Sequence, residues 1–279
     1  MAIAENEFKY IQDLVLRRSG IVLNEGKEYL VEARLLPLAK KRGLATVADL
    51  VAQLSKRPVP ELIDSVVHAM TTNETSFFRD IHPFQAFKEK IIPDILARRS
   101  SQKRLSIWCA ASSTGQEPYT LAILLREHFP ELRNWNVTFV ASDLSLDVLN
   151  RASQGRYSQL EINRGLSANL LVKYFKKQGL EWEIAPEIRQ MIDFKQINLL
   201  ETWPIAPLVD VVFIRNVLIY FNTDTKKQIL GRIRQLLRPD GYLFLGAAET
   251  TLNIDEQFER TAFDKSGSYQ PRSAARVAA

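Results

Sequence analysis

The chain has 279 residues, of which 46% are hydrophobic and 25% charged, a balance that predicts a globular protein built from a small and a medium domain. Its formal net charge of +5 suits an acidic partner, but no long Lys/Arg run interleaved with aromatic residues indicates nucleic acid binding. No apolar run approaches the roughly 20 residues of a membrane span, so we expect no membrane insertion.

Residues 1–72 are predicted to form a small all-helical domain. Apolar residues recur at helical spacing in FKYIQDLVL and in YLVEARLLPLAKKRG, where Gly43 suits a C-terminal stop. Thr46 is the expected N-cap of a third helix, and Pro60 falls in the first turn of a fourth. No alternating β-branched run occurs in this stretch.

Residues 73–100 are predicted to be a linker and a helix that lead into a second domain, residues 101–279, where strands and helices alternate. We expect strands at 104–110, 136–144 and 242–248 and one beginning near Leu208, helices at 116–129, 145–153 and 224–237, and a turn at 238–241. This order predicts an α/β fold with a parallel sheet covered by helices on both faces.

The segment 155–197 interrupts this alternation. It holds a polar helix and short strand-like pieces, LEWEI and MIDFKQI. We interpret it as an insertion, at about residues 160–196.

Cysteine and histidine are scarce. One cysteine, Cys109, excludes an internal disulfide, and His68, His82 and His128 do not cluster with it. The first residues, MAIAENEFKY, lack the basic start and apolar middle of a signal peptide. We therefore expect a cytoplasmic protein without a metal site.

The stretch WCAASSTGQEPYTLAILL runs from a strand into a helix through a loop with one glycine, Gly115. A dinucleotide-binding loop needs several glycines so that backbone amides can approach the pyrophosphate. Glu117, at the start of the helix, would also repel a phosphate. It suits a ligand ammonium or sulfonium, or it complements the helix dipole, and the sequence leaves both roles open.

Asp143 ends the next predicted strand. A carboxylate at this position can accept both hydroxyls of a ribose, or it can cap the following helix. One acid for a cation and another for a ribose point to a phosphate-free nucleoside with a charged tail, which is the shape of S-adenosylmethionine. Arg215, Asn216 and Tyr220 follow a further strand, at the sheet edge where ligands of open α/β folds bind.

Five motifs, MTTNETSFFRD, WCAASSTGQEPYTLAI, ASDLS, INLL and IRNVLIYF, resemble in their order those of the CheR family of chemotaxis receptor glutamate methyltransferases. The resemblance implies a helical N-terminal domain, then a class I (Rossmann-like) S-adenosylmethionine-dependent methyltransferase domain with an inserted small antiparallel β-subdomain. It implies a cofactor site of the following residues: Asn73, Thr75, Arg79, Glu117, Asp143, Asn198, Leu199, Arg215 and Asn216. It also implies that Tyr220 is the active-site tyrosine and that Arg79 faces the substrate.

The implied reaction forms methyl esters on glutamates of chemoreceptor cytoplasmic domains, with S-adenosylhomocysteine as product and no metal. We expect a monomeric enzyme. Two alternatives are a methyltransferase acting on RNA or a small molecule, which would need a basic track or a base-stacking pocket, and a non-catalytic cofactor sensor, which would lose Arg79 and Tyr220.

Some members of the family bind a receptor's C-terminal pentapeptide at an edge of the β-subdomain, and they carry a longer, glycine-bearing loop between two of its strands. The corresponding region here, KYFKKQGLEWEIAPEIRQMIDF, has one glycine, Gly179, and is a few residues shorter. We therefore expect that this chain does not bind the pentapeptide.

Overall fold

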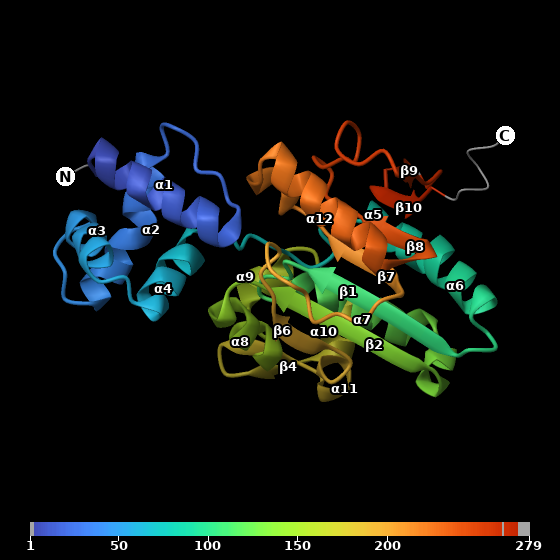
Figure 1. Cartoon of the computed structure of the whole chain (residues 1–279). Helices are drawn as coiled ribbons and strands as arrows, with labels where there is room; N and C mark the ends of the chain where they lie inside the picture. Colours follow the sequence, from blue (N-terminus) through green and yellow to red (C-terminus); the bar gives the residue numbers. More distant parts are fainter. Residues whose placement is uncertain (1–2, 264, 273–279) are drawn as a thin grey trace. The chain divides into compact units, whose positions relative to one another are not determined.

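The computed structural model describes residues 3–263 and 265–272, and the chain forms two compact units (Figure 1). The N-terminal unit consists of Met1–Thr72 with two later segments, Asn198–Thr202 and Tyr220–Thr225. The sheet unit consists of Asn73–Ile197, Trp203–Ile219 and Lys226–Ala279.

The N-terminal unit is built from four amphipathic helices, α1 (Glu5–Ser19), α2 (Glu28–Lys41), α3 (Val47–Lys56) and α4 (Pro60–Met70). Their apolar faces meet in one core that includes Ile11, Leu35 and Leu50. The predicted cap of α3 is confirmed, because the Thr46 hydroxyl accepts a hydrogen bond from the Asp49 N–H at 3.1 Å. The predicted all-helical domain is therefore correct.

The two later segments contact the end of α1 and the turn after it. The Val22 N–H donates to the Tyr220 carbonyl oxygen at 2.9 Å, and the Asn198 side-chain amide donates to the Arg18 carbonyl oxygen at 2.8 Å. Gly20, with φ of 76°, ends α1, and a Cβ there would lie 3.1 Å from the Leu200 side chain. The close approach and the positive φ both favour glycine at this position.

A seven-stranded sheet in the order β6-β2-β1-β7-β8-β10-β9 forms the core of the sheet unit. The strands are β1 (Arg104–Ala110), β2 (Asn136–Asp143), β6 (Asp193–Gln196), β7 (Val209–Ile214), β8 (Leu237–Phe244), β9 (Phe258–Arg260) and β10 (Ser268–Pro271). The first five of the order are parallel, as predicted, whereas β10 is antiparallel to β8 and to β9.

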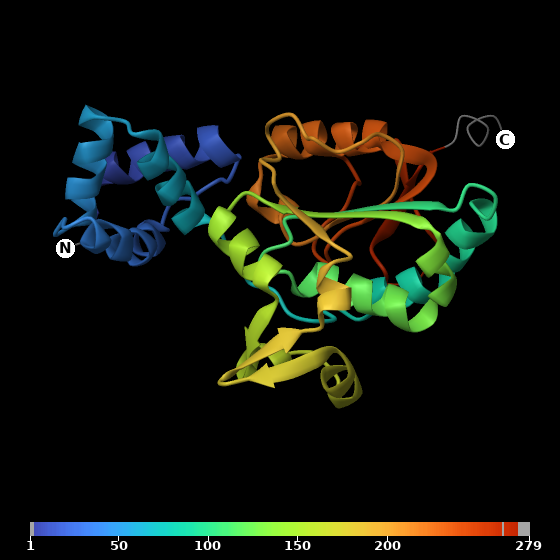
Figure 2. The same cartoon turned by 90° about the horizontal axis from the view of Figure 1, so that it is seen from below.

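Helices cover both faces of this sheet. Figure 2 shows the sheet nearly edge-on, with α12 (Thr223–Leu236) on one face and α6 (Ile92–Arg98) and α7 (Gln116–His128) on the other. The helix α8 (Leu146–Gln154) contacts β2 and β6. Phe213 and Phe244 stack between neighbouring strands, with ring centroids 4.1 Å apart. These layers confirm the α/β architecture predicted from the alternating pattern.

The helix expected within residues 73–100 consists of three pieces, α5 (His82–Ala86), the π-helical turn η1 (Phe87–Ile91) and α6. Pro93 lies at the start of α6 and has no N–H to donate to the preceding turn. The missing N–H of this proline interrupts the regular ladder of helical hydrogen bonds, and the chain forms the wider π-helical turn η1 just before it.

A second, three-stranded antiparallel sheet follows α8. Its strands are β3 (Arg156–Ser158), β4 (Phe175–Gln178) and β5 (Glu181–Ile184), in the order β3-β5-β4, and three short helices accompany them: α9 (Gln159–Asn163), α10 (Ala168–Tyr174) and α11 (Pro186–Arg189). The small antiparallel sheet is confirmed, but its strands begin before residue 160. β6, which also falls in the segment expected as an insertion, pairs with β2 at the edge of the large sheet.

The expected turn at residues 238–241 is wrong. Leu237 pairs with Val209 and Tyr242 with Val211, so Arg238–Gly241 bulges out within β8. Asp240 in this bulge forms ion pairs with Arg98 and Arg99 at the end of α6. The Asp-Gly pair is typical of a tight turn, but these ion pairs and the continuing ladder hold it inside the strand.

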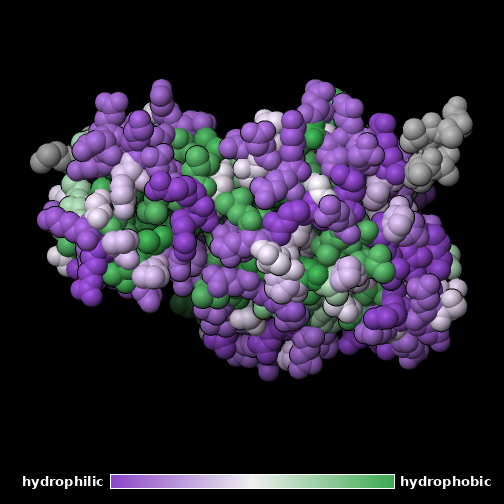
Figure 3. Space-filling view, in the orientation of Figure 1, coloured by the Kyte–Doolittle hydropathy of each residue, from purple (hydrophilic) through white to green (hydrophobic). Residues whose placement is uncertain are grey.

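No helix within the described residues is both long enough and apolar enough to span a membrane. Hydrophilic residues cover most of the face seen in Figure 3, with smaller groups of hydrophobic residues between them. Trp108, Phe87 and Phe213 are fully buried in the sheet unit, whereas Leu160, Val172 and Leu180 are among the large apolar side chains that stay exposed.

Candidate functional site

Three neighbouring strands of the large sheet end at one edge, which we call the carboxyl edge. The parallel strands β2, β1 and β7 lie side by side in this order, so the segments that follow them meet there. The chain order of the strands reverses at β1 and β7, and ligands of open α/β sheets bind outside such a switch point. The carboxyl edge is therefore the candidate site.

The loop between β1 and α7 has a strained backbone. Ala111 and Ser113 adopt left-handed conformations, with φ of 53° and 51°. Non-glycine residues in this region cluster at functional sites. The Ser112 hydroxyl between them is buried and has no hydrogen-bond partner among the described residues. Burying an unpaired hydroxyl is costly, so its position fits a polar group of a ligand.

Packing accounts for Gly115 in this loop. Its φ is 92°, and a Cβ there would lie 3.0 Å from the Ala152 Cβ and 3.1 Å from the Tyr157 hydroxyl oxygen. That hydroxyl donates to the Thr114 carbonyl oxygen at 2.8 Å, and burial raises the pKa of Tyr157 well above its ordinary value, so it stays a donor. A single packed glycine does not provide the glycine-rich backbone of a phosphate loop.

Asp143 ends β2 with a buried carboxylate. Its Oδ2 accepts from the Ser113 N–H at 2.9 Å and its Oδ1 from the Ser145 N–H at 3.0 Å. The first bond ties Asp143 to the β1–α7 loop, and the second lies at the start of α8. An ionised carboxylate has about four lone-pair sites, which suits a group that accepts several hydrogen bonds. Its ribose role stays a prediction.

Arg215, directly after β7, is the buried cation of the carboxyl edge. Its side chain is 1% exposed and forms an ion pair with Glu117. Its second terminal nitrogen donates to Asp80 Oδ2 at 2.9 Å and to the Arg79 carbonyl oxygen at 3.2 Å. The guanidinium also lies over the Phe84 ring. Arg215 thereby joins the linker segment to the first turn of α7.

Glu117 already has one cation in this structure. It lies in the first turn of α7, where a carboxylate also complements the helix dipole. Its Oε2 pairs with Arg215, and its Oε1 accepts from the Cys109 thiol at 3.4 Å. Burial, and then the charge of Glu117, raises the pKa of Cys109 well above its ordinary value, so the thiol stays protonated. A ligand cation near Glu117 would share the carboxylate with Arg215.

The linker segment is tied to the β1–α7 loop and to α7. The Ser113 hydroxyl donates to the Asn73 carbonyl oxygen at 2.8 Å, and the Phe78 N–H donates to the Thr120 hydroxyl at 3.2 Å. Phe77 is buried and packs edge-on against Tyr157, with ring centroids 5.0 Å apart. These contacts fix the segment that carries three predicted site residues.

Arg79 lies between two left-handed residues, Phe78 with φ of 51° and Asp80 with φ of 57°. Its side chain turns back and donates to the Glu74 carbonyl oxygen at 2.8 Å. A guanidinium has five N–H donors, so this bond leaves others for a ligand. The positive φ values indicate a backbone held in a costly conformation at a candidate site.

Two of the predicted residues line an open cavity of about 450 Å³ in the sheet unit. Its lining consists of Asn73, Glu74, Thr75, Thr114, Gln116, Asp147, Val148, Arg151, Glu161 and Arg164. Asn73 and Thr75 thus share a cavity with the β1–α7 loop. Five other predicted site residues do not line this cavity: Arg79, Glu117, Asp143, Arg215 and Asn216.

The other three predicted residues group with the N-terminal unit. The Asn198 amide donates to the Arg18 carbonyl oxygen and accepts from the Leu200 N–H at 3.0 Å, so its side chain serves the local fold. Leu199 is buried, and Tyr220 is half-buried at the end of the short turn η3 (Leu218–Tyr220). The predicted cofactor contacts of Asn198 and Leu199 and the predicted active-site role of Tyr220 stay predictions.

The sequence reasoning missed three residues of this edge. Ser112 and Asp80 lie inside quoted motifs, but nothing in a motif shows that a hydroxyl is unpaired or that an aspartate meets Arg215. Glu249, after β8, accepts from the Asn216 N–H at 2.8 Å. No sequence signal connects it to Asn216, 33 positions earlier.

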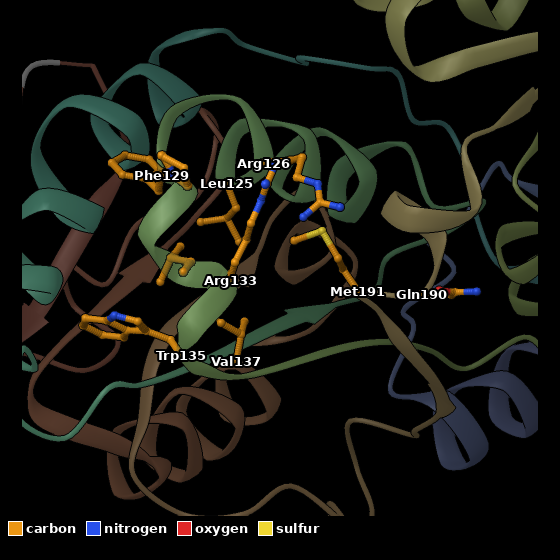
Figure 4. Close-up of a pocket in the computed structure, with 10 residues that line it drawn as sticks. Leu125, Arg126, Phe129, Arg133, Trp135, Val137, Gln190 and Met191 are labelled. Atoms are coloured by element: carbon orange, nitrogen blue, oxygen red, sulfur yellow. The ribbon is translucent and has the colours of Figure 1, made fainter.

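A second cavity, of about 240 Å³, lies away from the carboxyl edge (Figure 4). It opens between the end of α7 and the start of β2, with Leu125, Arg133, Trp135 and Met191 among its lining. In Figure 4 the Arg126 side chain extends toward Met191, and Gln190 points away. None of the predicted site residues lines it.

The carboxyl edge fits a nucleoside with a positively charged tail better than a nucleotide. It offers two carboxylates, Glu117 and Asp143, and the unpaired hydroxyl of Ser112. No group of three or more His, Cys, Asp or Glu side chains that could hold a metal ion occurs within residues 3–263 and 265–272. That the reaction needs no metal stays a prediction.

Two family profiles match the chain in the same order as its two main parts. The profile described as "CheR methyltransferase, all-alpha domain" matches residues 6–71. The profile described as "CheR methyltransferase, SAM binding domain" matches residues 73–266.

Two similar proteins span almost the whole chain. The chain is 39% identical over 264 residues to the Chemotaxis protein methyltransferase Cher2 of Pseudomonas putida, covering 93% of this chain and 95% of that protein. Identity and coverage are the same for the Chemotaxis protein methyltransferase 1 of Pseudomonas aeruginosa. A solved TehB-like SAM-dependent methyltransferase from Corynebacterium glutamicum matches 63% of this chain and 83% of its own, at 12% identity and a TM-score of 0.36, a likeness too slight to carry an argument.

Proposed function

This chain belongs to the CheR methyltransferase family, and from that premise we propose that it methylates glutamate side chains on the cytoplasmic helices of chemoreceptors, forming glutamyl methyl esters. The observation that carries the proposal is the pair of family matches, over residues 6–71 and 73–266, together with relatives named as chemotaxis protein methyltransferases. Membership makes the chain an S-adenosylmethionine-dependent methyltransferase. The glutamate substrate is the proposed part.

The residues of the candidate site suit a nucleophile that needs no base. A glutamate has a reference pKa near 4.3, so it is ionised at neutral pH. When bound, S-adenosylmethionine supplies a methyl group on a positively charged sulfur. One carboxylate oxygen forms a bond to the methyl carbon while the carbon–sulfur bond breaks, and no proton moves. None of the five motifs contains a histidine, which agrees with this chemistry.

Opposite charges disappear as the methyl group moves, so water that stabilises them in the ground state slows the reaction. The chain's contribution is therefore exclusion of water and positioning. In the proposal Arg79 holds the incoming carboxylate by charge-assisted hydrogen bonds, and Tyr220 orients it. Asp143 holds the ribose, and Glu117 holds the positively charged tail. The cofactor site is completed by six further residues: Asn73, Thr75, Asn198, Leu199, Arg215 and Asn216.

We expect methyl transfer to produce an ester. The purified protein is incubated with methyl-labelled S-adenosylmethionine and receptor cytoplasmic fragments, and the label should be released as methanol by mild alkali. Alkali-stable label would contradict the proposal and support nitrogen methylation.

In the same assay Arg79→Ala and Tyr220→Phe should lower the rate while the fold is kept. Wild-type rates in both variants would remove these two residues from the substrate side.

We also propose that the enzyme acts on the methylation helices without binding a receptor's C-terminal pentapeptide. Two residues, Gly179 and Leu180, connect β4 to β5, and this short connection supports the proposal. Without a tether, binding gains no effective concentration, so the rate should follow the bulk receptor concentration. Calorimetric titration with the pentapeptide should give no saturable heat. Saturable micromolar binding would overturn this proposal and leave the methyltransferase assignment unchanged.

A further inference from the structure

The carboxylate of Glu249 collects hydrogen bonds from four backbone N–H groups. Its Oε2 accepts from Gly246 at 2.6 Å and from Asn216 at 2.8 Å. Its Oε1 accepts from Val217 at 2.9 Å and from Ile219 at 3.3 Å. Three of the four donors therefore belong to the segment that follows β7, which carries a predicted cofactor residue.

This segment cannot satisfy its own N–H groups. Asn216 is left-handed, with φ of 59°, so the chain turns sharply as soon as it leaves the strand. The following residues enter the one-turn helix η3, whose first N–H groups have no partner within the turn. A carboxylate has two oxygens and about four lone-pair sites, which matches the number of donors here.

The loop after β8 approaches the same segment closely. A Cβ at Gly246 would lie 2.8 Å from the Asn216 backbone nitrogen and 2.7 Å from the Glu249 Oε2. Real Cβ atoms do not come this near, so glycine is required for the two loops to touch. Glu249 and Gly246 together fix where the backbone of Asn216 lies relative to β8.

We propose that Glu249 is a positioning residue for the cofactor-binding end of β7. Arg215 is held through its side chain by Glu117 and Asp80, whereas Asn216 is held through its backbone by Glu249. Glu249 acts through residues 216–219 and does not itself contact the ligand. The inference rests on the cofactor role proposed for Asn216, and it deepens that role by naming the group that sets its geometry.

The test replaces Glu249 by Gln, which keeps the size of the side chain but offers one acceptor oxygen in place of two. At least two of the four donors then lose their partner. We expect the affinity for S-adenosylhomocysteine, measured by calorimetry, to fall about tenfold. Hydrogen exchange at the amides of residues 216–219 should become faster. Glu256→Gln is the matched control, because Glu256 is exposed in the same part of the chain and should bind like the wild type.

A folded Glu249→Gln protein with wild-type affinity would overturn the proposal, even if its melting temperature were lower, because Glu249 would then serve stability alone. If the Gln variant does not fold, Glu249→Asp gives the same comparison, since its shorter side chain keeps the charge but cannot span both loops. Binding of S-adenosylhomocysteine requires no receptor. The result therefore does not depend on which side chain the enzyme methylates.

Discussion

Replacing Arg215 by Met is expected to lower the free energy of unfolding by about 3 kcal/mol, because removing one partner of a buried ion pair leaves the other charge uncompensated. Methionine keeps most of the apolar stem, so packing changes little. The side chain of Glu117 is 13% exposed and loses its cation, whereas that of Asp80 is 42% exposed and can turn to water. Because only Glu117 is left without a partner, the expected loss of stability lies at the low end of the range for buried ion pairs.

Urea unfolding followed by circular dichroism measures the change. The double variant Arg215→Met/Glu117→Gln removes both charges and should regain more than half of the loss, since neither group is then left unpaired. Arg104→Met, at an exposed position in β1, is the control and should change stability by less than about 0.5 kcal/mol. A loss below about 1 kcal/mol for Arg215→Met would show that water already compensates Glu117.

The regular elements of the sheet unit were predictable because their patterns are strong and local. The apolar run that follows Arg104 and the periodic helix from Gln116 correspond to β1 and α7 in the structure. The Thr46 cap was predictable for the same reason, since the capping hydroxyl and the N–H group that donates to it lie three positions apart. Predictions from local sequence patterns of this kind are correct when the tertiary contacts favour the same secondary structure.

The pairing of short edge strands was not predictable. β6, Asp193–Gln196, lies in the strand-like piece MIDFKQI, but only its pairing with β2 shows that it belongs to the large sheet. β9 has three residues, and β10 ends at a proline. Such segments bury few side chains, so the sequence carries little periodic signal for them. The turn predicted at residues 238–241 was wrong for the opposite reason. Its turn signal is strong, but tertiary contacts keep the segment as a bulge within β8.

The sequence predicts a set of candidate residues but not the contacts between them. Glu117 and Asp143 were identified from where their strands end, yet the partner of Glu117 is Arg215, 98 positions later. Only the order of the strands brings these two residues together. Ser112 and Glu249 carried no signal, since an unpaired hydroxyl and a carboxylate shared by backbone amides are properties of the folded chain.

Replacing Asp143 by Asn is expected to weaken S-adenosylhomocysteine binding by tenfold to a hundredfold. Hydrogen bonds to a charged acceptor contribute roughly 1.5–3 kcal/mol each, which corresponds to this range of affinity. Asn keeps one oxygen for the Ser113 or Ser145 N–H, so it disturbs the loops less than Ala does. Asp193→Asn is the control, because the side chain of Asp193 is 62% exposed and forms a surface ion pair with Lys195.

A ligand that lacks the ribose hydroxyls separates a direct contact from an effect on the loops. The wild-type protein should bind a 2′,3′-dideoxy analogue of S-adenosylhomocysteine more weakly than the parent compound, whereas Asp143→Asn should bind the two almost equally. The losses of binding free energy caused by removing the ribose hydroxyls and by replacing Asp143 are then non-additive, as expected for groups in direct contact. If the variant discriminates between the ligands as strongly as the wild type does, Asp143 does not hold the ribose. Its carboxylate would then serve only the N–H groups of Ser113 and Ser145, which is the capping role that the sequence leaves open.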